Sequence, residues 1–262
     1  MRNVVPMLKP SNGELRAIQA WHGFLVWGSW TDGMLSELMP CFEEIFPTLH
    51  SRFGERQRES FCQFLAGIAC YGSIDPVQNG WLQRFLKAVT LEERAMWANS
   101  TSWTLSKMKE PLADRAWDRW IGAYWQNRID GLPMPLDTAE ISAMIPWVKA
   151  FRLSYSKAIE KIYLSPLPKT EHGFFYHELN KSSLPKSYPE DTAKLILYLL
   201  KADFAPIYVF NEVVDIFHQI APCIEARDAL VRICDQLARL GYFGAADLRR
   251  SLNGGNQPPE GD

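Results

Sequence analysis

Apolar side chains recur along most of the chain at every third or fourth position, which is the spacing of amphipathic α-helix. A serine and a glutamate with the spacing of a capping box precede the first stripe. The second stripe contains Pro40, which is expected to kink or split its helix. The first stripe is Leu15, Ile18, His22 and Leu25, with Ser11 and Glu14 as the box, and the second is Leu35, Leu38, Phe42, Ile45, Phe46 and Leu49.

Capping and stop signals set the expected helix boundaries in the middle of the chain. Thr90 and Glu93 again have the spacing of a capping box, so a helix is expected to begin there. The most aromatic helix is expected over 111–129, because an Asp-Gly pair followed by two prolines comes directly after it. The next helix is expected to break or bend at Pro146.

The last hundred residues continue the helical pattern after one long irregular stretch, 165–189. Residues 192–201 are apolar on nearly all sides, as in a helix buried inside a stack. The segment 207–220 is rich in β-branched and aromatic residues, which admits a strand, but its polar positions favour helix. Residues 226–240 carry the clearest stripe. Its polar side holds the i,i+4 pairs Asp228 with Arg232 and Asp235 with Arg239.

This pattern predicts an all-α fold of stacked antiparallel helices. No run of alternating strands and no hairpin signature interrupts it. Both a compact helical array and a short α-solenoid, HEAT-like, fit the pattern, since no exact repeat of fixed period is visible. We expect an N-terminal arm over 1–10, one helical domain over 11–252 with a possible sub-boundary near 165–189, and a disordered tail over 253–262.

Composition indicates the expected cellular compartment and argues against some kinds of partner. The 262 residues carry a formal net charge of −2, so no global field attracts the chain to nucleic acid or an anionic membrane. The longest apolar run, 195–200, is far shorter than the ~20 residues of a spanning helix, and no signal peptide is visible. A cytoplasmic location is expected. The five cysteines are odd in number and form no C-x-x-C pair, which indicates reduced, buried thiols.

No pattern of established catalytic chemistry is present. The chain lacks a nucleophile elbow, a phosphate-binding loop and a dinucleotide-binding turn, and no metal site and no cofactor are expected. His22 lies on an apolar stripe and is interpreted as a core or boundary residue. His172 and His177 are five residues apart, whereas a metal pair on one helix face needs three or four. With Glu178 they remain the best candidates for a non-standard enzyme site.

One segment, 115–128, combines four aromatic side chains with arginines. Its rings either fill the gap between helical layers or form, in part, a surface for a protein or nucleic acid. The core interpretation is favoured, with Trp117 and Trp120 innermost and Trp125 and Arg128 most accessible. A local basic set follows at Lys149, Arg152, Lys157 and Lys161, where a solvated face competes with a phosphate contact. The candidate partner-binding residues are Arg115, Arg119, Trp125, Arg128, Lys149 and Arg152.

The spacing of aromatic residues and prolines in the central and C-terminal parts resembles the bacterial family called domain of unknown function 4020, over roughly residues 80–250. The resemblance is carried by the segments Trp117-Asp-Arg-Trp120, Tyr124-Trp-Gln-Asn-Arg128, Gly131-Leu-Pro133, His172 to Leu179, Ser183-Leu-Pro185 and Pro189 to Leu195, with Leu136, Glu140, Met144, Trp147 and Leu199-Leu200. It implies a helical module often found C-terminal to sirtuin-like, NAD-consuming parts of proteins associated with defence against phage. It implies no catalytic residues, and this chain has no dinucleotide fingerprint.

Taken together, these observations favour a non-enzymatic helical module that senses or scaffolds by binding a protein. Two alternatives stay open. One is an enzyme built around His172, His177 and Glu178, and the other is a helical protein that binds nucleic acid weakly.

Overall fold

The computed structural model describes residues 4–9, 14–168, 173–201 and 207–254, and every regular element in those ranges is helical. The predicted all-α fold is therefore confirmed. The chain divides into two compact units, Met1–Phe151 and Arg152–Asp262. This division lies ahead of the 165–189 segment, and the single domain over 11–252 stays a prediction. The expectation that 165–189 is irregular is wrong for much of the segment, because the helices Gly173–Lys181 and Leu184–Ser187 lie within it.

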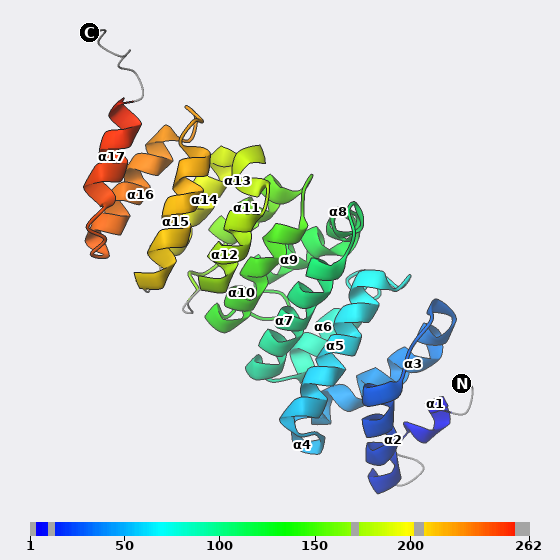
Figure 1. The fold of residues 1–262 in the computed structure, drawn as a ribbon. Helices are drawn as coiled ribbons and strands as arrows, with labels where there is room; N and C mark the ends of the chain where they lie inside the picture. The colour runs from blue at the N-terminus through cyan, green and yellow to red at the C-terminus, as the bar shows by residue number, and fades with distance from the viewer. Residues whose placement is uncertain (1–3, 10–13, 169–172, 202–206, 255–262) are drawn as a thin grey trace, which may run out of the picture. The chain divides into compact units, whose positions relative to one another are not determined.

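Unit 1, coloured from blue to green in Figure 1, holds the elements before residue 151. They are α1 (Val4–Met7), α2 (Glu14–Trp27), α3 (Asp32–Ile45), the 3-10 turn η2 (Phe46–Thr48), α4 (Leu49–Arg52), α5 (Glu55–Tyr71), α6 (Trp81–Ala88), α7 (Leu91–Lys107), α8 (Leu112–Ala116), the π-helical turn η3 (Trp117–Ile121), α9 (Gly122–Ile129), α10 (Thr138–Met144) and the 3-10 turn η4 (Ile145–Ala150). Unit 2 holds α11 (Tyr155–Tyr163), α12 (Gly173–Lys181), α13 (Leu184–Ser187), α14 (Pro189–Leu200), α15 (Ile207–Ile220), α16 (Arg227–Arg239) and α17 (Ala245–Gly254).

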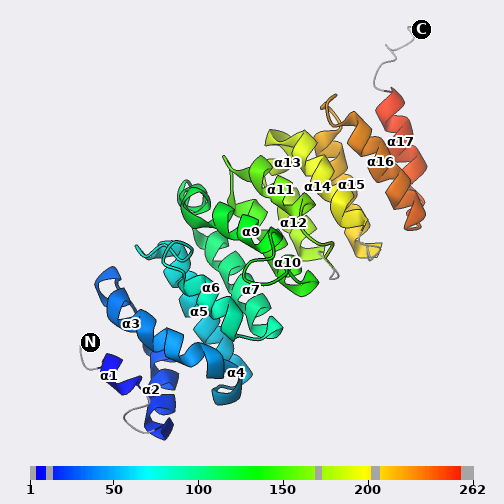
Figure 2. The same cartoon turned by 180° about the vertical axis from the view of Figure 1, so that it is seen from behind.

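In unit 1 every second long helix points the same way. The first turns of α5 and α7 lie side by side where Arg58 meets Glu92, and both helices are 17 residues long. The segment from α10 to η4 repeats this direction, because Glu140 lies near Arg94 and the Trp147 indole donates to the carbonyl of Ala98. Figures 1 and 2 show α5, α7 and α10 following one another.

The segment from α8 through α9 is antiparallel to the layer formed by α5, α7 and α10. At its start, the Arg119 guanidinium reaches the carbonyls that end α5. At its end, Arg128 reaches Glu140 in the first turn of α10. Helices consecutive in sequence are thus antiparallel, while every second helix is a parallel neighbour. That neighbour pattern is typical of stacked helix pairs in an α-solenoid.

Unit 2 repeats the pattern. The Tyr155 and Thr192 hydroxyls meet 3.1 Å apart near the start of α11 and α14, and Tyr198 reaches the Ser165 carbonyl beyond the other end of α11. Gln236 of α16 donates to the carbonyl of Leu200 at the end of α14. These three helices are therefore parallel. Their layer faces α12 and α15, which are parallel to each other through pairs such as His177 with Glu212.

Aromatic rings form the core of unit 1. Ring centroids 5.0 to 6.4 Å apart link Trp21 of α2, through Phe42, Phe61 and Phe85, to Trp97 of α7 and onward to Phe151. Such rings bury large areas and prefer edge-on contacts. The indoles therefore fill the space between helical layers, as the favoured interpretation of segment 115–128 predicts.

Several local predictions are confirmed and some are wrong. Thr90 and Glu93 form the capping box of α7, the chain changes to a 3-10 turn at Pro146, and 207–220 is helical. Pro40 does not interrupt α3, which continues through it. Asp235 pairs with Arg249 of α17, not with Arg239.

The expected N-terminal arm and C-terminal tail lie only partly within the residues that the structure describes. Within the arm, α1 is helical and the Leu8 carbonyl accepts from the indole of Trp21. The helix α17 extends to Gly254, and residues 255–262 lie outside the described ranges. Ser11 of the first expected capping box also lies outside them.

Among the described helices, none combines the length and apolar character needed to cross a bilayer. All five cysteines are unbridged. Four are buried, as expected, and Cys223 is half-buried. Burial raises the pKa of the Cys70 thiol to about 12, so that side chain stays protonated and unreactive near neutral pH.

Candidate functional site

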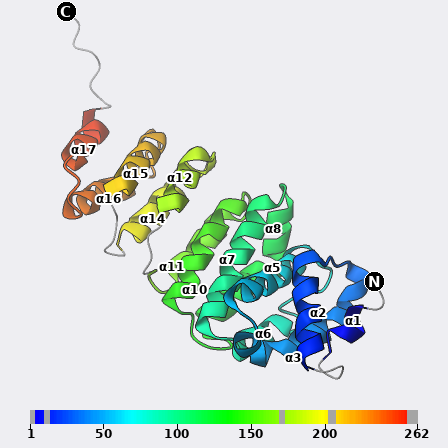
Figure 3. The ribbon, with the colours of Figure 1, turned by 60° about the horizontal axis from the view of Figure 1, so that its bottom comes forward.

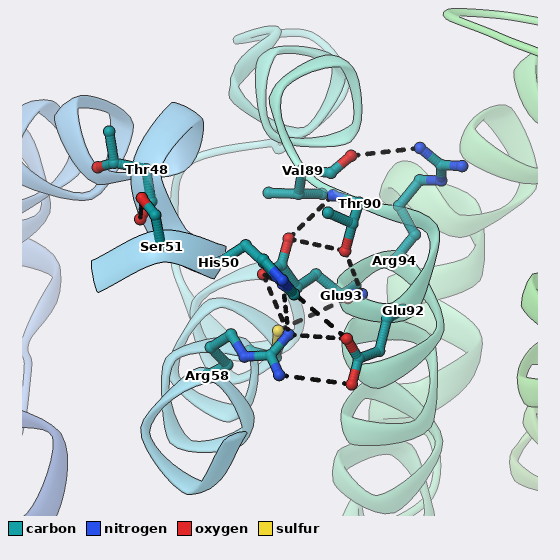
Figure 4. A network of polar contacts seen from close by, with 10 residues as sticks. Thr48, His50, Ser51, Arg58, Val89, Thr90, Glu92, Glu93 and Arg94 are labelled. Atoms are coloured by element: carbon teal, nitrogen blue, oxygen red, sulfur yellow. Dashed lines mark hydrogen bonds and ion pairs between the residues drawn. The ribbon is translucent and has the colours of Figure 1, made fainter. Parts of the chain in front are cut away.

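A polar network in unit 1 lies at the first turns of α5 and α7 (Figure 4). The guanidinium of Arg58 is at its centre. It donates to Glu92 at 2.9 Å and to Glu93 at 3.4 Å, and its Nη1 lies 3.0 Å from His50 Nδ1. The hydrogen bond from Arg58 lowers the pKa of Glu92, so its carboxylate is charged near neutral pH.

Glu93 is the buried carboxylate of this network, with a side chain that is 1% exposed. One oxygen accepts from the backbone N–H and the hydroxyl of Thr90, at 2.9 and 3.1 Å. The other faces Arg58. Both oxygens are therefore engaged in capping α7 and in the ion pair, and Glu93 serves as a structural anchor.

His50 is the most exposed member, at 59% of its side chain. Because an arginine can only donate hydrogen bonds, Nδ1 of His50 is the acceptor in the contact with Arg58. The same Nδ1 atom lies 3.5 Å from an oxygen of Glu93, so this edge of the ring is turned into the cluster.

A buried thiol, Cys62, contacts the same network through the backbone carbonyl of Glu93 at 3.7 Å. Burial is the main cause that raises its pKa, with the charge of Glu93 adding to it. The thiol points to a carbonyl, not to His50. Although cysteine, histidine and glutamate lie close together here, the cluster lacks an activated nucleophile.

A second arginine–glutamate pair is fully enclosed between α9 and α10. Arg128 donates to both oxygens of Glu140 at 2.8 and 2.6 Å, and the side chains of both residues are 0% exposed. The Tyr124 hydroxyl donates to the same carboxylate at 3.2 Å. Burial, followed by the charge of Glu140, raises the pKa of Tyr124 well above its usual value. This tyrosine stays protonated as a hydrogen-bond donor.

Comparison with known proteins returns one family. The sequence model of the family described as Domain of unknown function (DUF4020) matches residues 73–237. The chain belongs to the DUF4020 family. No curated protein and no solved structure matches it. The DUF4020 match begins after α5 and ends within α16, so Glu92, Glu93, Arg128 and Glu140 lie inside it, while His50 and Arg58 precede it.

Two of the candidate partner-binding residues in the DUF4020 region are not accessible. Trp125 and Arg128 were predicted to be the most exposed members of segment 115–128, and this prediction is wrong, since both are 0% exposed. The π-helical turn 117–121 holds an additional residue, which rotates the following side chains by about 100° and turns Trp125 from the margin of the buried face toward its centre. Arg128 follows the buried Tyr124 by four residues and therefore lies on the same face. Trp117 and Trp120 are buried as predicted.

The remaining candidates differ in their surroundings. Arg119 is half-buried and donates to the carbonyls of Gly72 and Cys70, so it caps the C-terminal end of α5. Arg115 is exposed. Burial lowers the pKa of the half-buried Lys149 to about 8, which weakens it as a phosphate contact. Arg152 is half-buried and donates to the hydroxyl of Ser183.

The proposed histidine site is only partly described. His172 lies outside the described residues. His177 pairs through Nδ1 with Glu212 at 2.7 Å, and its neighbour Glu178 is half-buried. Asn180 donates to the other oxygen of Glu212 at 2.7 Å. Within the described ranges, no group of three or more histidine, cysteine or acidic side chains is placed to hold a metal ion.

One feature that sequence reasoning missed is a set of exposed apolar side chains on α2. The stripe of Leu15, Ile18, His22 and Leu25 was expected to face the core. This is wrong for Leu15, which is 71% exposed, and for His22, which is exposed as well, whereas Leu25 is buried as expected. The buried side is shifted around the helix and includes Trp21 and Phe24. Since α2 is apolar on two sides, periodicity alone could not decide which side packs inward.

Proposed function

We propose that this chain is a non-enzymatic helical interaction module that binds a protein partner, as a sensor or scaffold of a bacterial antiphage defence or stress system. The observation that supports it best is the pair of exposed apolar side chains at the C-terminal end of α2. Trp27 is 87% exposed and its neighbour Val26 is 53% exposed, and both line one hollow. Exposed apolar side chains that border a hollow are typical of protein-binding surfaces, and tryptophan is enriched among their energetic centres.

The polar groups support the same proposal by exclusion within the described ranges. In each of the two arginine–glutamate clusters, the arginine and the glutamate hydrogen-bond to one another, and Glu93 also caps α7. Their histidine accepts from an arginine, and their thiol is held neutral by burial. Such groups stabilise helix packing and offer a substrate no free base or nucleophile.

The test begins with capture of partners from cells that produce the chain, followed by re-formation of the complex from purified components. We expect a defined stoichiometry by sedimentation and a measurable affinity by calorimetry. In parallel, the purified chain alone is incubated with NAD and with nucleic acid. Turnover of either, or failure of every captured protein to bind in pure form, would refute the proposal.

The second candidate, an enzyme, rests on the pair of His177 and Glu212. A carboxylate that accepts from Nδ1–H orients an imidazole and leaves Nε2 free to accept a proton. If that pair is catalytic, His177→Ala abolishes an activity of the purified chain, while His50→Ala leaves it unchanged. If no activity depends on His177, this candidate is excluded.

A further inference from the structure

The C-terminal end of α2, with the exposed Val26 and Trp27, borders a hollow in unit 1. It lies between the C-terminal half of α2 and the first turns of α5, and its volume is about 360 Å³. Val26 and Trp27 form its apolar wall, and Val26 is 53% exposed. This volume is at the lower end for ligand pockets, so the hollow suits one anchoring side chain of a larger partner. Figure 3 shows α2 with α5 at the end of unit 1 that includes the N-terminus.

The opposite wall of the hollow is basic. Arg56 is exposed, and its guanidinium has no ion-pair partner within the described part of the chain. The lining also includes Gln57 and Ser60 but no carboxylate. Glu55 and Glu59 are on the same helix without lining the hollow.

The first turn of α5 adds to this positive character. Its N-cap is Gly54, which has no side chain to accept from the free N–H groups. The first N–H groups of a helix carry a partial positive charge that favours a nearby carboxylate. The hollow therefore pairs one apolar wall with one wall that attracts an anion.

We propose that this hollow receives a segment of a partner protein that carries an apolar side chain next to an aspartate or glutamate. The apolar side chain packs against Val26 and Trp27, and the carboxylate pairs with Arg56. This inference rests on the proposed function and names the partner's chemistry.

Two other occupants fit less well. A second copy of the chain docked symmetrically through this face would bring two Arg56 guanidinium groups into one interface, where like charges repel. Nucleic acid binds through several cations that neutralise successive phosphates, whereas this hollow has one arginine beside an apolar wall.

The experiment selects binders from a random dodecapeptide phage library on the full chain and, in parallel, on the Trp27→Ala and Arg56→Glu chains. Matched controls are Trp103→Ala, which removes a tryptophan that is 64% exposed on α7, and Arg239→Glu, which reverses an exposed arginine on α16. Far-ultraviolet circular dichroism verifies that every variant is folded.

On the unmodified chain we expect peptides enriched in an aromatic or aliphatic residue next to an acidic one. Their synthetic versions should lose about 30-fold in affinity on Trp27→Ala, as for a binding hot spot. Arg56→Glu should cost about 10-fold and reverse the selected charge toward lysine and arginine. Both controls should change affinity by less than about 2-fold.

The outcomes separate this inference from the proposed function. Selected peptides whose binding ignores Trp27 and Arg56 would overturn the hollow as the docking site and leave an interaction role elsewhere. Peptides that need Trp27 but carry no acidic residue would overturn the stated chemistry, as would self-association that depends on Trp27. If the unmodified chain selects no peptides beyond those that the Trp27→Ala chain also selects, the inference is overturned. The proposed function is tested separately, by capture of the native partner.

Discussion

The two arginine–glutamate clusters of unit 1 use the same chemical groups in different surroundings. Arg128 and Glu140 are wholly enclosed and form a two-point ion pair with a tyrosine as a third donor. Arg58 shares its donors among His50, Glu92 and Glu93, and the side chain of Glu92 is 49% exposed. Water can replace a lost partner only at the second cluster. Burial, more than the number of contacts, therefore sets how much each cluster matters to stability.

The largest effect is expected at the enclosed pair. Glu140→Ala leaves the Arg128 guanidinium buried without its counter-charge, which lowers the free energy of unfolding by about 3–5 kcal/mol. Urea denaturation measures the change. The double variant Arg128→Leu, Glu140→Leu removes the unpaired charge of Arg128, but it leaves Arg94 without the nearby carboxylate and the carbonyls of Leu132 and Met134 without their donor. It should still be less destabilising than Glu140→Ala. Equal losses in both variants would show that the unpaired charge of Arg128 is not the main cost.

A smaller loss of stability is expected at the cluster of Arg58, Glu92 and Glu93, called here the half-exposed cluster because the Glu92 side chain is 49% exposed. Arg58→Ala removes the donor that faces the buried Glu93, and we expect it to lower the free energy of unfolding by about 2 kcal/mol. The matched control is Arg84→Ala, which breaks a surface pair with Glu43 at 2.7 Å and should cost less than about 1 kcal/mol. If the two substitutions cost the same, the network in Figure 4 contributes no more than a surface pair.

The contrast between the clusters also shows how far the sequence could be interpreted. The capping box of Thr90 and Glu93 is local, three residues apart, and was predicted from the sequence. The partner of Glu92 is Arg58, 34 residues earlier on another helix, and no local pattern points to it. Arg58 and Glu92 come together only because α5 and α7 pack side by side in the fold.

The enclosed pair was missed for a different reason. Arg128 and Glu140 are 12 residues apart across a turn where Gly131 has φ +79°. A charged side chain was expected on the accessible side, although Arg128 follows Tyr124 by four residues and shares its buried face. Its burial is possible because Glu140, which no local pattern links to it, supplies the counter-charge. Helix type, some helix ends such as the capping box at Thr90, and the aromatic core were predictable, since each depends on apolar spacing or caps. The inward face of α2 was not.

The smallest effect concerns protonation at the exposed edge of the half-exposed cluster. Arg58 lowers the pKa of Glu92 in the folded chain, first through its hydrogen bond and then through its charge. Because the folded-state pKa lies below the unfolded one, this contribution to stability is complete above the unfolded-state pKa and disappears as pH falls through the folded-state value. An NMR titration of the Glu92 side chain should show a pKa below the ordinary value of 4.5 that returns toward it in Arg58→Ala.

Arg84→Ala is the control for this titration, since Arg84 pairs with Glu43 and should leave the Glu92 midpoint unchanged. A Glu92 midpoint that stayed low without Arg58 would assign the shift to the remaining neighbours of this carboxylate, which are His50 and the first turn of α7, where the helix N-terminus also favours a carboxylate. The measurement thus decides whether the Arg58 guanidinium is the main group that holds this carboxylate in its charged form.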